Sequence, residues 1–544
     1  MLRVFAKSGP LICLALTVLA GNATAQSSPA VDLPILNRGG SARFLSQTSF
    51  GPDPASIALV TLIGRDAWLA GQLLQPPTLH LPRYEALAET LDPADARHAA
   101  WWEIALTAPD QLRQRVAFAL SEIFVVSETD SALGNRQDQL AAYYDILVRN
   151  AFGNYRDLLE EVTLSPAMGL FLSHLGNDKP DPESGRRPDE NYAREAMQLF
   201  SIGLWELNRD GSAVLDAFGE QIPTYDQDSI EQYARIYTGW TWSHRDSFGR
   251  GSRREDETHD PMKAFADHHD AGEKTLIDGT VVPAGQTPDE DLEQALDSLF
   301  NHSNVAPFIA RQLIIKLITS NPSPAFINRV AAVFENNGLG VRGDLGAVVT
   351  AIFLDPEARL GILSDANLYG KLKEPLIRLT HLLRAFEATS ASGIYGLRSA
   401  RSAYGQAPLA APSVFNFFSP HFQQPGVIRD AGYFSPEFQL QTETQGIRIV
   451  DDLAKRVAVT ADDASDNQPV LDLSGLVAIA DDADAMLDEI DVLLLGGTMS
   501  DALRGIATQM IALIPDDGED ATRLRRAQAA VTAAVVSPEF AVQR

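Results

Sequence analysis

The sequence predicts a mainly α-helical protein, a large multi-helix globular domain that carries a small β-hairpin insertion. Apolar residues recur three and four positions apart in 112–126 and 306–319, the pattern of a helix with one buried face. Alternating apolar and polar runs, which are typical of half-buried strands, are rare. The best candidate is 275–282, where Asp278-Gly279 stands between two short extended runs and favours a hairpin turn.

The composition predicts a folded chain with an acidic surface. The 544 residues are 45% hydrophobic, which is enough for a sizeable core. Asp and Glu outnumber Lys and Arg by 72 to 44, and the net charge is -28. This excess argues against nucleic acid and anionic membrane surfaces as partners, because phosphate groups bind basic surfaces.

Residues 1–25 have the pattern of a secretory signal peptide. Arg3 and Lys7 form a basic start, 11–20 is apolar, and Ala23-Thr24-Ala25 is a typical cleavage site. The apolar run is too short to span a membrane, and no later stretch is long enough. We therefore expect Sec-dependent export, cleavage after Ala25, a periplasmic or secreted protein and no membrane span after leader removal. The single cysteine lies in this leader, so the mature chain is predicted to be cysteine-free.

Changes in composition divide the rest of the chain. Residues 26–37 form a linker that contains Ser and Pro, and a helical core follows over 38–445. We expect loop insertions in this core at 176–188, which is rich in charge, Pro and Gly, and at 245–295, which is polar. Residues 446–544 are predicted to form an acidic helical region that packs on the core.

A proline preceded by Ser or Asp recurs where new helices are expected. Ser and Asp are good helix caps, and Pro suits the first helical position. The pairs are Ser165-Pro166, Asp355-Pro356, Ser435-Pro436 and Ser537-Pro538. A duplicated helical unit and the repeated use of one capping pattern both explain them, and their irregular spacing favours repeated capping.

The first candidate site lies on a helix predicted over 189–200. Asn191, Arg194, Glu195 and Gln198 stand at positions i, i+3, i+4 and i+7, so they share one helix face. An acid, a cation and two amides on one face could bind a sugar or a carboxylate, with Glu195 as a general acid/base. The alternative is an exposed helix with an internal Arg194–Glu195 contact.

The second candidate site is the run His268-His269-Asp270, which Lys274 follows. Imidazole and carboxylate groups are good ligands for zinc and other divalent ions. Adjacent histidines on an extended chain point to opposite sides, however, so a shared metal needs a turn or a distant partner such as His174. The candidate metal ligands are His268, His269, Asp270 and His174. The alternative is a loop that polar contacts hold in place.

The third candidate is the aromatic segment 225–242. Asp226 or Asp228 can cap a helix that runs to Tyr237, and Trp240 and Trp242 then alternate as in a strand. Their rings could line a sugar site or fill the core, which is the commoner role of buried tryptophans.

A set of ordered segments connects these candidates. The most specific is Glu190-Asn191-Tyr192-Ala193-Arg194-Glu195, which Leu199-Phe200 and Gly203 follow. The others are 42–52, 153–168, Ala234-Arg235, Thr238-Gly239-Trp240, His269-Asp270, Lys274-Thr275, Lys373-Glu374-Pro375 and 415–420. Together they resemble the bacterial domain-of-unknown-function family DUF 1800 over about residues 40–445.

The resemblance implies a mainly α-helical and often exported protein. Such proteins are often encoded beside another exported family, DUF 1501, which resembles sulfatases, so a DUF 1501 protein is the predicted partner. The resemblance also implies one catalytic site made of Asn191, Arg194, Glu195, His269 and Asp270. Substrate-binding roles are predicted for Tyr192, Arg235, Trp240 and Lys274. The chain departs from the family pattern at Gln198, where Glu is common, so no second carboxylate acts at that position.

Two functions remain open from the sequence. The first is a secreted hydrolase or lyase that acts on a polar polymer such as a polysaccharide. Glu195 would be its general acid/base, Arg194 its anion clamp and Asn191 a positioning amide, while His269 and Asp270 would be a second acid/base pair or metal ligands. The second is a non-catalytic export or surface-assembly protein that works with a neighbouring exported partner. A cleft that joins Glu195 and His269 would favour the enzyme, and an exposed apolar patch would favour the partner protein.

Overall fold

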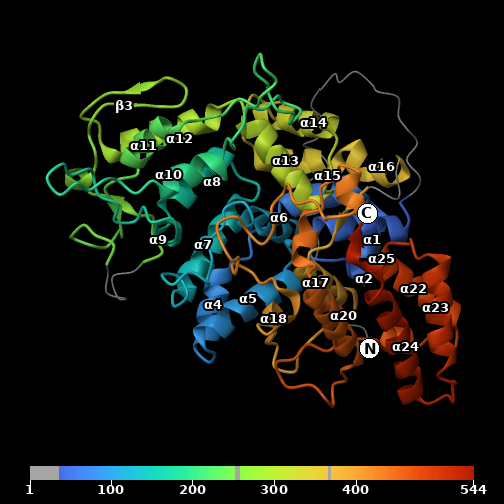
Figure 1. The fold of residues 1–544 in the computed structure, drawn as a ribbon. Helices are drawn as coiled ribbons and strands as arrows, with labels where there is room; N and C mark the ends of the chain where they lie inside the picture. Colours follow the sequence, from blue (N-terminus) through green and yellow to red (C-terminus); the bar gives the residue numbers. More distant parts are fainter. Residues whose placement is uncertain (1–35, 252–257, 365–368) are drawn as a thin grey trace. The chain divides into compact units, whose positions relative to one another are not determined.

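The computed structural model describes residues 36–251, 258–364 and 369–544, and Asn37–Arg544 form one compact unit. Helices follow one another through this unit, and the sheets among the described residues have two strands each (Figure 1). The predicted fold class, a mainly α-helical domain with a small hairpin insertion, is confirmed. The predicted signal peptide and nearly all of the linker lie outside the described residues.

The first part of the unit is built around a buried helix, α6. All eleven residues of α6 are buried, and it contacts α3, α5, α7 and α13. Since Arg113, Gln114 and Arg115 are buried with it, the interior of the protein must supply polar partners. The helices of this part are α1 (Arg38–Thr48), α2 (Pro54–Ile63), α3 (Arg65–Leu73), α4 (His80–Ala88), α5 (Pro93–Thr107), α6 (Gln111–Ser121), α7 (Gln137–Asn150), α8 (Tyr155–Leu164) and α9 (Pro166–Phe171).

The middle part carries the predicted site residues. Helix α10 packs on α11, α11 on α12 and α12 on α8, and Figure 1 shows these four helices close together. The elements are α10 (Asn191–Gln198), α11 (Gln227–Ile236), β1 (Trp240–Thr241), β2 (Lys263–Ala264), the 3-10 turn η2 (Ala266–His268), β3 (Lys274–Thr275), β4 (Val281–Val282), α12 (Pro288–Asn301), α13 (Val305–Leu317), α14 (Pro324–Glu335), α15 (Leu345–Leu354) and α16 (Pro356–Ser364).

The predicted hairpin is strands β3 and β4, which pair antiparallel with Thr275 opposite Val281. Asp278 and Gly279 form its turn. The Asp278 side chain accepts a hydrogen bond from the Thr280 amide at 3.0 Å, and Gly279 adopts a φ of 81°, which favours glycine. The hairpin lies within the predicted loop insertion at 245–295, together with β2 and η2.

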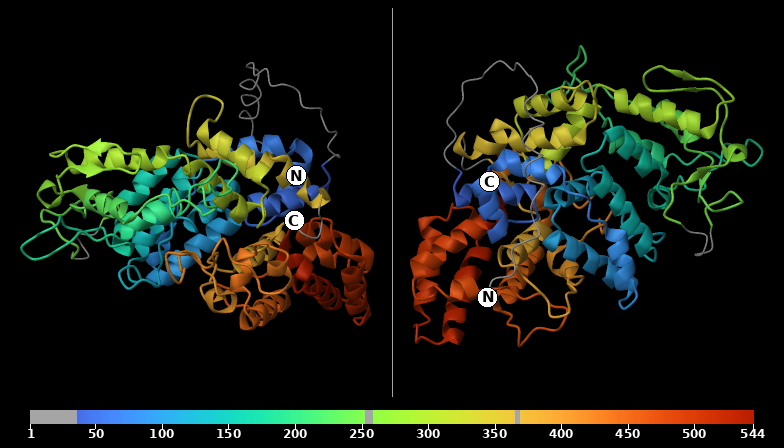
Figure 2. Two further views of the ribbon diagram at one scale, coloured as in Figure 1. Left: turned by 45° about the horizontal axis from the view of Figure 1, so that its top comes forward. Right: turned by 180° about the vertical axis from the view of Figure 1, so that it is seen from behind.

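The C-terminal part returns to the beginning of the unit. Strand β6 pairs with β5, and the π-helical turn η4 contacts α1, so the last residues pack next to the first helix (Figure 2). The elements are β5 (Lys371–Leu372), α17 (Pro375–Ala385), α18 (Ala400–Tyr404), α19 (Val427–Asp430), the 3-10 turn η3 (Pro436–Leu440), α20 (Glu443–Ala458), α21 (Ser474–Val477), α22 (Ala483–Ile490), η4 (Asp491–Leu495), α23 (Asp501–Ala512), α24 (Asp520–Val535), α25 (Pro538–Ala541) and β6 (Val542–Gln543). The sequence analysis placed a boundary between residues 445 and 446, and helix α20 runs across this position. The division of the chain into a core and a C-terminal region stays a prediction.

Local capping explains several helix starts. Pro166, Pro356, Pro436 and Pro538 each open a helix or 3-10 turn, as the sequence predicts. Helix α10 begins at Asn191, two residues later than predicted, because the Asp189 carboxylate accepts the Asn191 amide at 2.8 Å in the turn before it. Among the described residues, no helix has both the length and the apolar character needed to cross a membrane.

Candidate functional site

Helix α10 divides its predicted polar face between the interior and the surface. Its apolar residues Ala193 and Met197 are fully buried and fix the orientation of the helix. Glu195 is buried too, with 5% of its surface exposed, whereas Asn191 is exposed and Arg194 is half-buried. The carboxyl group therefore lies beneath the amide and the guanidinium rather than beside them.

The Glu195 carboxyl group has an incomplete set of partners. Its Oε2 atom is buried and accepts no hydrogen bond. Burial raises the pKa of Glu195, and the positive charge of Arg194 opposes this effect only in part. Arg194 donates instead to Oε2 of Glu190 at 3.2 Å, and Gln227 donates to the same oxygen at 3.0 Å. Glu195 is thus a carboxyl group that favours its protonated form close to a surface cation.

Tyr225, the first residue of the aromatic segment 225–242, had no assigned role of its own in the sequence analysis, and the charge of the Glu195 carboxyl group acts on it. Tyr225 is half-buried, and burial raises the pKa of its hydroxyl, while the charges of Arg194 and Glu195 lower and raise it, respectively. Tyr225 immediately precedes Asp226, whose side chain caps α11 by accepting the Ser229 amide at 2.9 Å. We call Glu195, Arg194, Asn191 and Tyr225 the Glu195 group.

Buried aromatic rings support α10 from the inside. The hydroxyl groups of Tyr192 and Thr163 lie 2.6 Å apart, and the rings of Tyr192 and His174 lie 3.9 Å apart. His174 Nε2 lies 2.8 Å from the Thr163 carbonyl oxygen, and burial lowers the pKa of His174 to about 4, so the ring is neutral at neutral pH. Tyr192 is 1% exposed. This burial favours a supporting role for Tyr192 over direct contact with a polymer.

The second predicted site forms a buried ion network. His269 Nε2 lies 3.0 Å from Asp291 Oδ2, and His269 Nδ1 lies 3.0 Å from the carbonyl oxygen of Thr238. Lys274 Nζ donates to the same Asp291 oxygen at 2.6 Å and also donates to the Asp270 carbonyl. The side chains of His269, Lys274 and Asp291 are each 1% exposed. Both nitrogens of His269 face oxygen atoms, so neither is turned toward a metal ion.

Asp270 and Arg235 extend this network to the end of α11. The Arg235 guanidinium donates to both carboxylate oxygens of Asp270, at 2.7 and 3.1 Å, and the Asp270 amide donates to Thr238 Oγ1 at 2.9 Å. Burial raises the pKa of Asp270, but Arg235 and the Gly272 amide outweigh this effect and lower it. We call Arg235, His269, Asp270, Lys274 and Asp291 the loop clasp, because they fasten the segment 269–274 to α11 and α12.

The two predicted sites are separate regions. Tyr225 of the Glu195 group precedes α11, whereas Arg235 of the loop clasp lies at its C-terminal end. A ten-residue helix is about 15 Å long. Among the described residues, no hydrogen bond or ion pair joins Glu195 to His269 or Asp270. The sequence analysis also missed Asp291, which lies outside every motif it used, and only the fold brings this residue to the clasp.

The remaining predicted ligands point to different neighbours. His268 lies on η2, with its Nδ1 3.1 Å from Asp178 Oδ1 and its ring stacked on Phe248 at 4.0 Å. In the described part of the chain, no group of three or more His, Cys, Asp or Glu side chains could hold a metal ion. Trp240 is buried in β1, which favours the core alternative for this residue.

A larger ion cluster, not anticipated from the sequence, lies in the interior around α6. It consists of Arg115, Glu122, Lys316, Lys371, Glu374 and Glu437, all less than one-tenth exposed. Lys371 Nζ lies 2.9 Å from Glu437 Oε1 and 3.7 Å from Glu374 Oε1, and Lys316 Nζ lies 3.4 Å from Glu122 Oε2. We call this set the central ion cluster.

Two carboxyl groups of the central ion cluster, Glu122 and Glu374, act on one another. Burial and the charge of Glu374 raise the pKa of Glu122 to about 7. Burial also raises the pKa of Glu374, but Lys371 and Arg115 outweigh this effect and lower it. Glu122 is thus the carboxyl group of this cluster that favours its protonated form. In the sequence, Glu374 was visible only as part of the Lys373-Glu374-Pro375 segment, to which the sequence analysis assigned no role.

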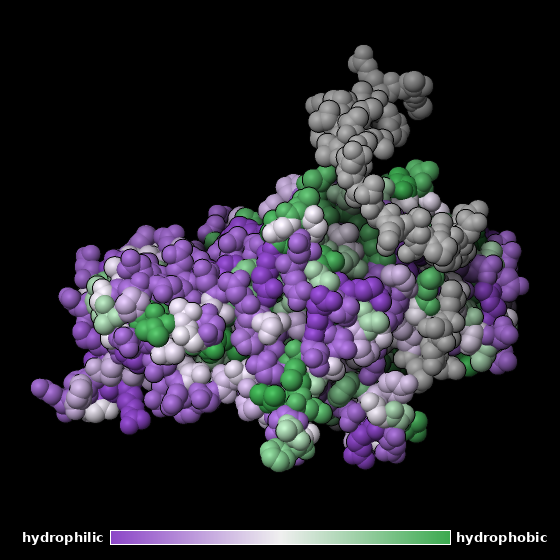
Figure 3. Space-filling view, turned by 90° about the horizontal axis from the view of Figure 1, so that it is seen from above, coloured by the Kyte–Doolittle hydropathy of each residue, from purple (hydrophilic) through white to green (hydrophobic). Residues whose placement is uncertain are grey.

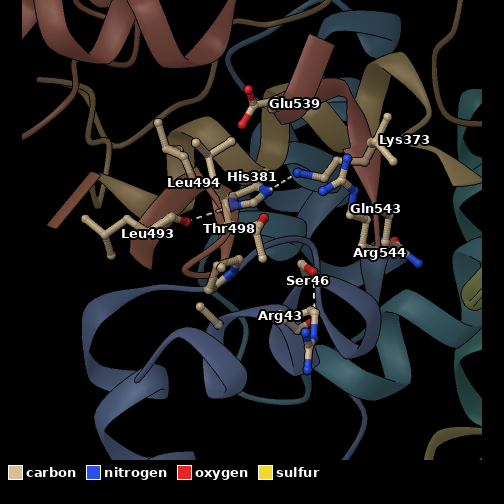
Figure 4. Close-up of a pocket in the computed structure, with 15 residues that line it drawn as sticks. Arg43, Ser46, Lys373, His381, Leu493, Leu494, Thr498, Glu539, Gln543 and Arg544 are labelled. Carbon is tan, nitrogen blue, oxygen red and sulfur yellow. Dashed lines mark hydrogen bonds between the residues drawn. The ribbon is translucent and has the colours of Figure 1, made fainter. Parts of the chain in front are cut away.

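Lys373, from the same segment, faces a separate small pocket. The pocket has an empty volume of about 400 Å³ and lies where α1, α17, η4 and the C-terminal residues meet (Figure 4). Lys373 Nζ lies 3.0 Å from His381 Nδ1, and His381 Nε2 lies 2.9 Å from the Leu493 carbonyl oxygen. Burial lowers the pKa of Lys373 to about 7, and burial and Lys373 lower the pKa of His381. The Lys373–His381 contact therefore stabilises a neutral imidazole that joins α17 to η4.

Comparison with known proteins identifies one family. A family model described as a protein of unknown function, DUF1800, matches residues 43–542. The match covers nearly the whole unit and extends through the C-terminal region, where the sequence resemblance was less clear. Neither the curated proteins nor the solved structures provide a match to this chain.

Proposed function

The chain belongs to the DUF1800 family, and we propose that it is an exported hydrolase or lyase that acts on a polar polymer such as a polysaccharide. The Glu195 group carries the proposed chemistry. The single supporting observation is the Glu195 carboxyl group, which is buried, unpartnered at Oε2 and raised in pKa, while the neighbouring guanidinium pairs with Glu190. Asp291, Glu374 and Glu437 also have one buried oxygen without a hydrogen-bond partner, but each of these carboxylates forms an ion pair, which Glu195 lacks among the described residues.

In this proposal Glu195 is the general acid/base. Because burial favours the protonated carboxyl group, Glu195 can give its proton to a leaving oxygen and take a proton back afterwards. Tyr225 serves as the second proton-transfer group, since its hydroxyl lies beside Glu195 and Arg194. Arg194 attracts an acidic group of the polymer from the surface, and the exposed Asn191 amide hydrogen-bonds to it.

The loop clasp has a positioning role in this proposal. Its side chains bind one another, so His269 and Asp270 act by holding the end of α11 and the loop that follows it. The predicted export fits this proposal, because a signal peptide would bring the protein to polymers that lie outside the cytoplasm. The metal ligands predicted from the sequence stay a prediction and carry no step of this mechanism.

The experiment compares two carboxyl groups of the same helix end. The purified chain and its Glu195→Gln and Glu190→Gln variants are incubated with neutral and acidic polysaccharides. New reducing ends report hydrolysis, and the ultraviolet absorbance of a new double bond reports a lyase. We expect Glu195→Gln to lose about 100-fold or more of the activity and Glu190→Gln to lose less than about tenfold. Unchanged cleavage by Glu195→Gln, or no cleavage of any polymer by the parent chain, would contradict the proposal.

A second candidate function is the non-catalytic surface-assembly protein with an exported partner, such as a DUF 1501 protein. Both criteria from the sequence analysis favour it: Glu195 and His269 lie in separate regions, and the outer face of α2 is an exposed apolar patch, where Leu59, Leu62 and Ile63 are 46%, 82% and 43% exposed. Figure 3 also shows hydrophobic patches on a largely hydrophilic face of the molecule. Co-purification of a DUF 1501 protein with this chain, lost in Leu62→Glu but not in Glu195→Gln, would support this function.

A further inference from the structure

Three arginines from different helices lie close together near the beginning of the unit. Arg43 belongs to α1, Arg65 begins α3 and Arg359 belongs to α16, and Figures 1 and 2 show α16 beside α1. The Arg65 guanidinium lies 5.8 Å from the centre of the Phe44 ring. Burial, followed by the charges of Arg359 and Arg43, lowers the pKa of Arg65 to about 10. The three charges therefore repel one another across a short distance.

The repulsion is compensated only in part, because the charge of Asp66 opposes the effect of Arg359 and Arg43 on Arg65. Among the described residues, none forms an ion pair with Arg43, Arg65 or Arg359. The acidic groups nearby are engaged elsewhere: Asp355 accepts two hydrogen bonds from Arg329, at 2.7 and 2.8 Å, and Glu357 accepts from the amide and hydroxyl of Ser323. The chain has a net charge of -28, so Asp and Glu side chains are plentiful. A shortage of carboxylates therefore does not explain why these three arginines form no ion pair.

The same place contains hydrogen-bond donors without acceptors. The Nε atoms of Arg65 and Arg359 and the hydroxyl oxygen of Tyr369 are buried and have no partner. Tyr369 is fixed against α16, because a Cβ atom on Gly361 would lie 2.2 Å from its ring. Burial and the charges of Glu357 and Asp355 raise the pKa of the Tyr369 hydroxyl, and the charge of Arg43 opposes them. Arg43 also lines the pocket that Lys373 and His381 face, and Figure 4 shows its guanidinium pointing away from those two side chains.

We propose that Arg43, Arg65, Arg359 and Tyr369 form a binding site for a tetrahedral oxyanion, a phosphate or sulfate group. The reason is chemical: unpaired donors and incompletely compensated positive charge in a half-buried place lack an anionic acceptor. Guanidinium groups bind phosphate and sulfate through paired N–H donors, and a phenol adds a neutral donor. The site is independent of the Glu195 group, and neither proposal needs the other.

The experiment is a thermodynamic cycle on the purified full chain. The melting temperature and calorimetric binding are measured with inorganic phosphate, with sulfate, and with sodium chloride at the same ionic strength. The variants are Arg65→Gln, Arg359→Gln and Tyr369→Phe, and the matched control is Arg187→Gln, which removes an exposed arginine. Dextran sulfate compared with uncharged dextran then tests whether a polymer can present the oxyanion.

We expect phosphate and sulfate to raise the melting temperature of the parent chain and chloride to leave it unchanged. Each arginine variant should weaken oxyanion binding by about tenfold or more, and Tyr369→Phe by less. In chloride alone, Arg65→Gln should melt at or above the temperature of the parent chain, because it relieves repulsion. A merely structural arginine would lower the melting temperature in every salt.

Three results would overturn the proposal. The first is no heat and no melting shift with either oxyanion beyond the chloride value. The second is equal weakening by Arg187→Gln and Arg65→Gln, which indicates bulk charge. The third is a loss of stability in chloride by both Arg65→Gln and Arg359→Gln, which indicates that the arginines hold the fold together without a ligand.

Discussion

The loop clasp and the Glu195 group are two polar regions at the two ends of α11, and they differ in whether their buried carboxyl groups form ion pairs. In the loop clasp, Asp291 Oδ2 binds both Lys274 and His269, although Asp291 Oδ1 is buried without a partner, and Asp270 binds Arg235 through two hydrogen bonds. In the Glu195 group, Oε2 of Glu195 is buried without a partner and, among the described residues, no ion pair compensates the carboxyl group. Charges that satisfy one another hold a structure in place, whereas an unpaired buried acid retains the capacity to exchange a proton.

The difference teaches that the kinds of residue do not by themselves distinguish a structural site from a chemical one. His269 and Asp270 have the side chains expected of a catalytic or metal site, yet their neighbours already use the polar atoms. Glu195 is one carboxyl group on an ordinary short helix, and burial alone gives it a raised pKa. Removing partners from each region therefore separates the two kinds of site.

The largest effect is expected for Asp291→Ala. This change leaves the Lys274 ammonium and the His269 ring buried without their carboxylate, which costs about 3–5 kcal/mol of unfolding free energy. Denaturant unfolding followed by circular dichroism measures the loss, and hydrogen exchange locates it in the loop and hairpin at 263–282. The control is Asp289→Ala on the same helix, whose exposed carboxylate is worth less than about 1 kcal/mol. Equal losses in both variants would contradict a clasp.

The second-largest effect is expected for the pH dependence of the unfolding free energy, which the carboxyl group of Glu122 in the central ion cluster controls. The pKa of Glu122 is about 7 in the folded chain and 4.5 in its ordinary state. Between these values the folded chain keeps a proton that the unfolded chain releases, so stability falls as pH rises, by up to about 3 kcal/mol in total. The lowered pKa of Glu374 acts at lower pH and does not share this window.

Glu122→Gln checks this sign, because its amide is neutral at every pH. Unfolding free energies measured from about pH 4.5 to about pH 7 should fall less steeply in Glu122→Gln than in the parent chain. The exposed Glu85→Gln should follow the parent slope. A parallel slope in Glu122→Gln would show that the Glu122 carboxyl group does not hold the proton.

A smaller effect is expected for the neutral part of the clasp. The Thr238 hydroxyl accepts the Asp270 amide at 2.9 Å and donates to the Arg235 carbonyl at 2.6 Å. Thr238→Val keeps the shape and removes both bonds, which costs about 1–2 kcal/mol. Thr238→Ser, which retains the hydroxyl, should recover most of this loss in the same denaturant experiment. A loss as large as that of Asp291→Ala would mean that charge is not what makes the clasp strong.

The smallest effect on stability is expected at Glu195, the proposed general acid/base. Glu195→Gln replaces an unpartnered carboxyl group with an amide of similar shape, so the unfolding free energy should change by less than about 0.5 kcal/mol. The same variant is expected to lose the activity against polysaccharides. A large destabilisation would instead place Glu195 among the structural acids, and the comparison between the two regions would fail.

Much of the fold could be predicted from local patterns. Helical periodicity predicted the segments that became α6 and α13, and the Asp278-Gly279 turn predicted the hairpin of β3 and β4. Ser or Asp before Pro predicted four starts. These features depend on neighbours within a few residues, so the sequence is sufficient for them. The predicted signal peptide, export and domain boundaries stay predictions.

The candidate site could be predicted only in part. Sequence reasoning selected Glu195 and the His269-Asp270 pair, but it expected them in one place because they followed one another in the ordered segments. It missed Asp291, and it gave Tyr225 no role of its own although it named the segment 225–242; both roles depend on contacts between separate elements. It also placed Asn191, Arg194 and Glu195 together on one helix face, since a helix position does not reveal how deep a side chain lies.

The sequence by itself determined the helical class, the hairpin, the acidic net charge and the family, because periodicity, turn chemistry, composition and ordered motifs are properties of the chain. Only the tertiary structure decided which charges find partners. Asp291 completes the loop clasp, Glu122 is buried within the central ion cluster, the Glu195 Oε2 atom has no hydrogen-bond partner, and the three arginines near α1 form no ion pair among the described residues. The reason is physical: burial and pairing depend on distances between segments far apart in the chain, and these distances determine whether a charged group stabilises the fold or stays available for chemistry.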